Sequence, residues 1–166
     1  MKSKLSKILT IFMLFIIIAS SITCTAHAES NIELIPSSDG DTLVVHSEIP
    51  GGLYDILINK HKYYYDHIKI TGKMNDKDFL FLTLASFNCK SIDLYEVDAK
   101  SMPSDLFCGS YDLEKFVCPH NLETIEKGNF TSCIGLKTVV LPKTLKSIEK
   151  CCFMYCNNLE LTVPES

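Results

Sequence analysis

Apolar side chains recur every 23 residues through the C-terminal half of the chain. Residues 113–130 and 136–153, aligned at that offset, are identical at eight of eighteen positions, whereas unrelated sequences of ordinary composition would share about one. The repeated columns are Phe107 with Phe130 and Phe153, Leu113 with Leu136 and Leu159, Pro119 with Pro142, Leu122 with Leu145, and Ile125 with Ile148. Because one turn of such a repeat cannot bury its own apolar face, the period predicts stacked turns with continuous apolar ladders.

Each repeat contains a short β-strand that ends near its proline. We expect strand cores at 116–118 and 139–141, with alternate side chains pointing inward. The residues expected to fill the core are Phe116, Cys118, Val139 and Leu141, followed on the return path by Leu122, Ile125 and Phe130. Val117 and Val140 then point outward, and the proline ends the strand pairing. The third copy, from Phe153, is one residue short of the period.

Weaker signals extend toward the N-terminus. We expect strands over 42–49 and 68–70, a helix opening at Pro50 with Leu53, Ile56 and Leu57 on its buried side, a helix over 76–86, and an atypical strand turn over 90–94. Met102 falls where a return path needs an apolar side chain.

The 23-residue pattern resembles the BspA-like leucine-rich repeat family of secreted and cell-surface bacterial proteins. Residues 130–148 follow the family repeat from Phe130 through Cys133 and the proline to Ile148, whereas Ser110 replaces the expected Cys one turn earlier. The resemblance implies an α/β-type repeat solenoid, a short horseshoe with parallel strands on its concave face, irregular or 3₁₀ return segments and an N-terminal α+β capping region. We expect this capping region over 29–86 and the repeats over 87–166, with about three recognisable turns, the last one incomplete.

Residues 1–28 have the three-part plan of a secretory signal peptide. A basic start with three Lys precedes an apolar run over 8–18, and small residues lead to Ala28, after which we expect cleavage. Two alternatives are an uncleaved anchor helix and a lipoprotein processed at Cys24. The apolar run is shorter than the ~20 residues of an ordinary membrane span, and residues 21–23 match the lipoprotein signal poorly. We therefore expect a secreted or cell-surface protein without a membrane span after cleavage.

Charge argues against anionic partners. All 16 basic side chains of the 166-residue chain are Lys, and the part after residue 28, with 13 Lys and 20 acidic side chains, has a net charge of −7. Without guanidinium groups or a basic patch, nucleic-acid binding is not expected.

The cysteines and histidines give no catalytic motif. Cys118 could pair with His120 as nucleophile and base, but a nucleophile needs a cleft, and Cys118 is expected to face the core. Metal ligation by these two residues, or by Cys151, Cys152 and Cys156, lacks the paired C-x₂-C spacing of zinc sites. We expect a non-enzyme without metal or cofactor.

Two cysteines one period apart, Cys133 and Cys156, should lie ~5 Å apart on neighbouring turns. Parallel Cβ vectors would strain a disulfide, so we expect buried thiols. The run Tyr63–Tyr65 could anchor a sugar or protein ligand; a linker with one or two packed Tyr is the simpler interpretation.

Two functional hypotheses follow. The first is a non-catalytic protein-binding or adhesion module that binds a protein or glycoprotein through its concave strand face. The outward positions expected to line that face are Lys69, Asp93, Lys115, Val117, Thr138 and Val140. The second is a structural or truncated solenoid fragment that self-associates through residues 153–166 and has no ligand of its own.

Overall fold

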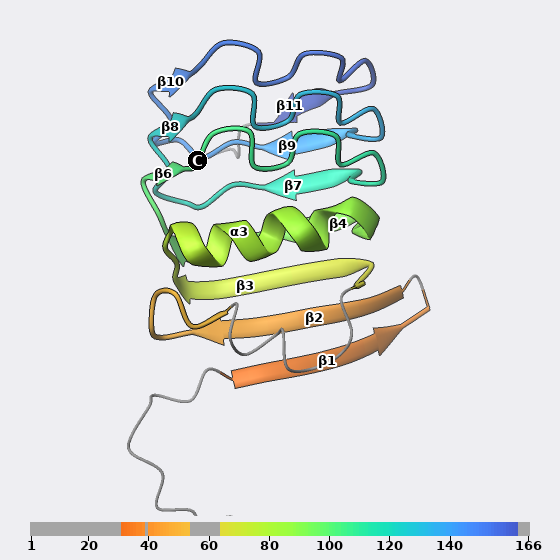
Figure 1. Ribbon diagram of the computed structural model, residues 1–166, viewed down its shortest axis with the longest axis vertical. Coiled ribbons are helices and arrows are strands. Elements are labelled where there is room, and N and C mark those ends of the chain that lie inside the picture. The colour runs from red at the N-terminus through yellow and green to blue at the C-terminus, as the bar shows by residue number, and fades with distance from the viewer. Residues whose placement is uncertain (1–30, 39, 54–63, 163–166) are drawn as a thin grey trace, which may run out of the picture.

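The computed structural model describes residues 31–38, 40–53 and 64–162, and in these ranges the chain forms a stack of turns. One strand from each turn joins a large sheet that runs the length of the stack in the order β1-β2-β3-β4-β7-β9-β11 (Figure 1). Its strands are β1 (Asn31–Ser37), β2 (Gly40–Ser47), β3 (His67–Lys73), β4 (Ser91–Asp93), β7 (Lys115–Val117), β9 (Thr138–Val140) and β11 (Glu160–Thr162), with the short β5 (Val97–Asp98) beside β3. All neighbours are parallel except β1 and β2.

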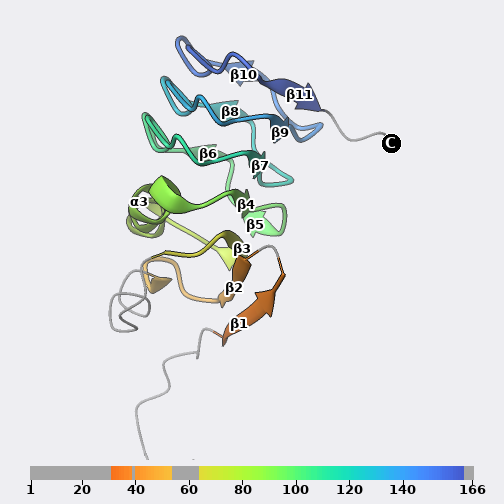
Figure 2. The same ribbon diagram turned by 90° about the vertical axis from the view of Figure 1, so that its right-hand side faces the viewer.

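A second, smaller parallel sheet lies along the return path of the turns (Figure 2). It contains β6 (Ser101–Met102), β8 (Thr124–Ile125) and β10 (Ser147–Ile148). Each complete repeat therefore contributes one strand to the large sheet and one to the small sheet.

The register between turns follows the sequence period closely. Ser91 pairs with Lys115, Lys115 with Thr138, and Thr138 with Glu160, giving spacings of 24, 23 and 22 residues. The shortened last copy is thus accommodated without a break in the large sheet. The strands β7 and β9 begin and end one residue earlier than the predicted ranges 116–118 and 139–141, because their backbone pairing starts at Lys115 and Thr138.

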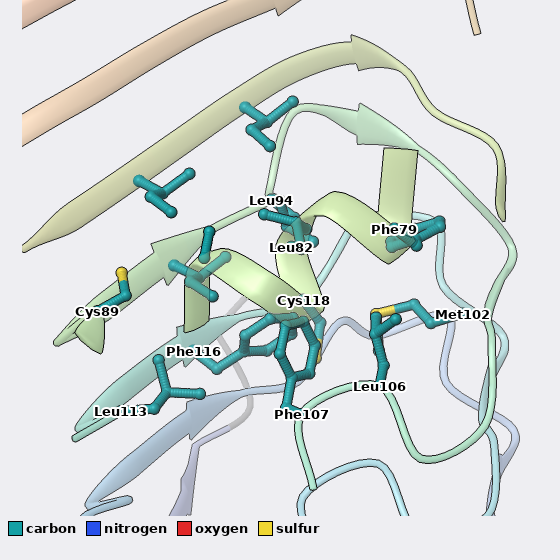
Figure 3. Close-up of a cluster of buried hydrophobic side chains, with 14 of the residues drawn as sticks. Phe79, Leu82, Cys89, Leu94, Met102, Leu106, Phe107, Leu113, Phe116 and Cys118 are labelled. Carbon is teal, nitrogen blue, oxygen red and sulfur yellow. The ribbon is translucent and has the colours of Figure 1, made fainter. Parts of the chain in front are cut away.

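The predicted ladders form the core. Phe116, Val139, Leu122 and Ile125 are fully buried, and Cys118 and Leu141 are almost so. Three phenylalanines one period apart, Phe107, Phe130 and Phe153, stack along the axis of the stack with ring centroids 5.4 Å apart at each step. Figure 3 shows Phe107 beside Phe116, whose rings lie 4.9 Å apart, in a cluster that also holds Phe79 and Leu82 of the helix α3 (Asp76–Ala85).

The helix α3 occupies the return path of one turn, on the side of the stack opposite the large sheet (Figures 1 and 2). Asn75 caps its first turn, and the carboxylate of Asp78 completes a capping box. That carboxylate is fully buried and also accepts hydrogen bonds from the backbone N–H groups of Gly51 (2.6 Å) and Leu53 (2.9 Å). One side chain therefore joins α3 to a segment 25 to 27 residues earlier.

Most predicted elements of the N-terminal part are present. The strands expected over 42–49 and 68–70 correspond to β2 and β3, and the helix expected over 76–86 corresponds to α3, followed by a 3₁₀ turn, η1 (Ser86–Asn88). Leu53 is buried as expected, while Ile56 and Leu57 lie outside the described residues. The antiparallel strand β1, which covers the outer edge of β2, was not predicted.

Candidate functional site

The outward side chains of the large sheet form two columns, which together we call the strand face. Backbone register places His67, Ser91, Lys115, Thr138 and Glu160 in one column, and Val44, Lys69, Asp93, Val117, Val140 and Thr162 in the other. All six residues predicted to line a binding face are therefore on this side of the sheet, four in one column and two in the other. Lys115 is exposed and the other five are partly exposed.

The strand face changes character along the stack. Its N-terminal end carries charged side chains. Lys69 donates a hydrogen bond to Glu96 (2.9 Å), and this bond raises the pKa of the lysine. The carboxylate of Asp93 accepts a hydrogen bond from the backbone N–H of Tyr95 (2.9 Å). Toward the C-terminal end, Val117 and Val140 are direct neighbours in the register and form an apolar strip. A ligand on this face would meet charge on one side and an aliphatic surface on the other.

Sequence reasoning missed an aromatic pair at the carboxyl ends of the strands. The rings of Tyr95 and His120 lie with centroids 5.9 Å apart, and both side chains are exposed. The Nδ1 atom of His120 is 2.9 Å from the carbonyl oxygen of Tyr95, and the backbone N–H of Leu94 donates to Val117. The pair is therefore anchored near the carboxyl end of β7, the strand that contains Val117. The available signal was that these two exposed residues fall just after strands in consecutive turns.

Charges alternate along the opposite rim of the sheet, at the residue before each strand. The column runs Asp66, Lys90, Glu114 and Lys137, one residue per turn. Lys90 lies 2.8 Å from Asp66, and Lys137 lies 2.8 Å from Glu114. These hydrogen-bonded lysines lower the pKa of both carboxyl groups.

A second alternating column precedes the strands of the small sheet. Glu123 accepts a hydrogen bond from Lys146 and lies 3.5 Å from Lys100, so that it is held between two cations. The pKa of Glu123 is lowered, mainly by the hydrogen bond from Lys146. In both columns, ion pairs join successive turns, and acidic and basic side chains alternate from one turn to the next. The two columns are therefore structural features of the stack.

The structure places Cys118 and His120 in different surroundings. Cys118 is buried, and burial raises the pKa of its thiol to about 12, so its thiol is protonated at neutral pH. His120 is exposed and interacts with Tyr95 instead. Among residues 31–38, 40–53 and 64–162, no three His, Cys, Asp or Glu side chains cluster as a metal site would require. Cys118 and His120 are thus not placed as a nucleophile and its base, while His67 and His46 lie 2.7 Å from the hydroxyls of Ser91 and Thr71.

The thiols of the repeats act as hydrogen-bond donors between turns. Cys133 donates to the carbonyl oxygen of Phe107 (3.0 Å), and Cys156 donates to that of Phe130 (2.9 Å). Both are free thiols. One turn earlier, Ser110 is hydrogen-bonded to the hydroxyl of Ser86 (2.7 Å), so a hydroxyl pair replaces the thiol there.

The tyrosine run contributes to the core at one position. Tyr65 is buried, Tyr64 is exposed, and Tyr63 lies outside the described residues. This agrees with a linker that packs one Tyr against the stack.

Surface hollows are shallow. The largest of those described, about 330 Å³, lies between α3 and the segment 103–106 and is bordered by Leu80, Thr83 and Leu106. Asp76, Pro103, Ser104 and Asp105 also border it, and no Cys or His is among its lining residues.

The repeated strand, the return path and the thiol and phenylalanine columns define a leucine-rich repeat protein. Comparison with known families supports this: residues 74–166 match the BspA-type leucine-rich repeat region in six copies, and the chain belongs to that family. A search of curated proteins finds no significant match. Leucine-rich repeats imply a solenoid-like fold, generally bind proteins and are typically non-catalytic, and those of the BspA type are typical of bacterial surface proteins. Across the described residues, no helix is both long and apolar enough to span a bilayer.

Proposed function

We propose that this protein is an exported, non-catalytic module that binds a protein or glycoprotein ligand through its strand face. The observation that carries the proposal is the aliphatic strip of Val117 and Val140, together with the exposed rings of Tyr95 and His120 just after the carboxyl ends of β4 and β7. Aromatic side chains at the edge of an apolar strip are frequent energetic centres of protein interfaces. The short horseshoe implied by the family would present this face as its concave side.

Export is the second part of the proposal. The three-part signal over residues 1–28 and the family's occurrence on bacterial surfaces both support it. Cleavage after Ala28 would release a chain with a net charge of −7, and such a charge favours solubility. A lipid attached at Cys24 remains the alternative means of display.

Affinity should be modest for a single copy. A stable pairwise interface buries about 800 Å² on each partner, and the strand face of so few turns offers barely that area. We therefore expect weak monovalent binding that becomes strong when several copies are displayed together.

The test is a pull-down with residues 29–166 displayed as a multimer against host matrix, mucin and bacterial-envelope extracts. The double variant Val117→Glu/Val140→Glu runs beside it and should lose the captured ligand, because two carboxylates would lie on the apolar strip. The matched control is Leu80→Glu/Leu84→Glu, which places the same charges on exposed apolar positions of α3, away from the large sheet.

The outcomes separate clearly. A ligand captured by the wild type and the α3 control, but lost by the folded strand-face variant, supports the proposal. If the strand-face variant still captures the ligand, the assigned surface is wrong. If the multimeric wild type captures no ligand, the binding function itself is contradicted.

A second candidate function is self-association through the C-terminal turn. Exposed apolar side chains at this end of the stack favour it: Ile148, Met154, Tyr155 and Leu161 are all more than 40% exposed. In this case the protein would be a structural element that joins copies of itself.

A further inference from the structure

The C-terminal end of the stack exposes the last members of two apolar ladders. Ile148 is 42% exposed, although Ile125, its register partner one turn earlier, is fully buried. Leu161 is 49% exposed, although Val139, its partner in the preceding strand, is fully buried. Both side chains are in positions that every earlier turn of the repeats buries. The end of the stack is therefore apolar because within the described residues no turn follows it.

This end is not flat but has a step. In each complete turn a strand of the large sheet is followed by a strand of the small sheet, so that β9 and β10 belong to one turn. The strand β11 pairs with β9 and therefore begins a further turn of the stack. Among the described residues nothing occupies the corresponding place beyond β10. The large sheet consequently includes a strand of this last turn, whereas the described part of the small sheet ends with the turn before it.

No strand of the described residues pairs with the outer edges of β10 and β11, and these free edges offer hydrogen-bonding groups at matching positions. The N–H of Glu160 donates to Lys137 and the carbonyl of Thr162 accepts from Leu141, so these two residues face β9. In a parallel ladder the residue between them directs its N–H and C=O to the other side, and that residue is Leu161.

The same pattern holds for β10. The N–H groups of Ser147 and Glu149 donate to the preceding turn, at Glu123 and Ile125. The N–H and C=O of Ile148 are thereby directed to the free edge. Each free edge thus presents one apolar side chain and one pair of backbone groups from the same residue.

We propose that two copies of this chain join end to end about a two-fold axis, with β11 of each copy pairing with β10 of the other. This proposal deepens the second candidate function and rests on it. A two-fold axis that is perpendicular to the stacking direction and passes midway between the two sheets exchanges the places of β10 and β11. In this arrangement β11 of each copy occupies the place beyond β10 of the other copy.

The register follows from the backbone groups. In an antiparallel pair, directly opposite residues that face each other exchange both hydrogen bonds, so Leu161 of one copy comes opposite Ile148 of the second copy. Both side chains point toward the core, and their contact continues the two apolar ladders. Thr162 then comes opposite Ser147 of the second copy. The exposed Met154 and Tyr155 belong to the same end and would be covered as well.

Self-complementarity identifies the occupant as a second copy. Each copy supplies the strand that the other lacks, so one operation covers four free edges and the assembly closes at two subunits. Direct pairing of β11 with β11 of a second copy would leave both β10 edges exposed. A foreign strand on one edge would leave the other edge uncovered.

One contact in the dimer is unfavourable, and it provides a sharp test. Glu160 comes opposite Glu149 of the second copy, and like charges directly opposite are destabilising. Replacing Glu149 by Lys converts both symmetry-related contacts into ion pairs. Glu149→Lys should therefore strengthen the dimer, whereas an unspecific apolar association would not respond in this way.

The experiment is analytical ultracentrifugation of residues 29–166 over a wide concentration range. The wild type should show a monomer–dimer equilibrium with no larger species. Leu161→Lys should weaken dimerisation at least roughly tenfold, and so should Ile148→Lys. Leu84→Lys, at a position on α3 that is 57% exposed, is the matched control and should leave it unchanged. Circular dichroism of each variant verifies the fold.

Cross-linking tests the register. Ser147→Cys/Thr162→Cys should yield a covalent dimer under mild oxidation, with the 147–162 linkage found by peptide mass spectrometry, and neither single variant should yield it. The wild type under the same oxidant controls for the native thiols.

Three results would overturn the proposal. A chain that stays monomeric at all concentrations refutes both self-association and this geometry. Self-association without the 147–162 linkage, or self-association that Glu149→Lys weakens, refutes the geometry but leaves self-association intact. None of these results bears on ligand binding at the strand face, which the Val117 and Val140 variants test separately.

Discussion

Phe130 and Phe153 lie one repeat apart and stack with ring centroids 5.4 Å apart and planes only 7° from parallel. The two rings differ in their surroundings, because Phe130 is fully buried between turns and Phe153 lies partly exposed in the last one. Identical positions of the repeat therefore contribute differently to stability according to their place in the stack.

The phenylalanine column predicts a graded loss of stability. Phe130→Ala should lower the free energy of unfolding by roughly 3–5 kcal/mol, because it removes a large buried side chain and leaves a cavity. Phe153→Ala should cost clearly less, since its ring already contacts solvent. Urea denaturation followed by circular dichroism measures both. Equal losses would show that the last turn is as well packed as the central ones.

The thiols should differ sharply in reactivity. Cys108 and Cys151 are exposed, whereas Cys89, Cys118 and Cys133 are buried with thiol pKa values raised by burial to about 12. The thiolate is the reactive form, so the buried thiols should resist alkylation up to pH 9. Iodoacetamide labelling with peptide mass spectrometry, with and without denaturant, checks this. Rapid native labelling of Cys118 would contradict its place in the core.

Asp78 should be essential for the N-terminal part of the stack. Asp78→Ala removes the carboxylate that accepts hydrogen bonds from the backbone N–H groups of Gly51 and Leu53, the second of which is buried. The loss should lower the free energy of unfolding by roughly 2–4 kcal/mol. Asp76→Ala, at an exposed acidic position in the same helical turn, is the control and should cost below about 1 kcal/mol. Thermal and urea unfolding compare the two. Similar values for both variants would rule out the linking role.

Acid should weaken the contacts between turns. Lysine partners lower the carboxyl pKa values of Glu114 and Glu123 in the folded protein. A carboxyl group whose pKa is lower in the folded state stabilises the fold fully above its unfolded pKa, about 4.3 for Glu, and this contribution is lost as the pH falls through the folded pKa. We therefore expect stability to decrease below about pH 4.5.

The pH effect can be assigned by substitution. Glu114→Gln/Glu123→Gln should lower stability at pH 7 and flatten its decrease in acid, and the difference should shrink in high salt. The control is Glu33→Gln, an exposed carboxyl of β1 outside both columns. Urea denaturation at several pH values measures the effect. An unchanged pH profile in the double variant would show that other groups cause the acid sensitivity.

The sequence predicted the repeat strands well because their packing is set by neighbouring turns of the same period. Alternation placed Phe116 and Val139 inside and Val117 and Val140 outside, and the structure agrees. The strand β1 was not predicted, because it contains Pro36 and prolines are tolerated only at the edges of sheets; strand ends were located only to within one residue. The helix α3 was predicted in place, but not the buried link from Asp78 to residues 51–53.

The sequence alone determined that the chain is built from 23-residue turns, which side chains enter the core, and which family the pattern resembles. These features follow from periodicity, since each turn must bury its apolar face against the next. Only the tertiary structure decided which charges meet between turns, how Tyr95 lies beside His120, and that the large sheet ends at β11 while the small sheet ends at β10. These three features depend on side-chain positions and on the register of strands some 22 to 24 residues apart. A pattern of apolar positions determines neither.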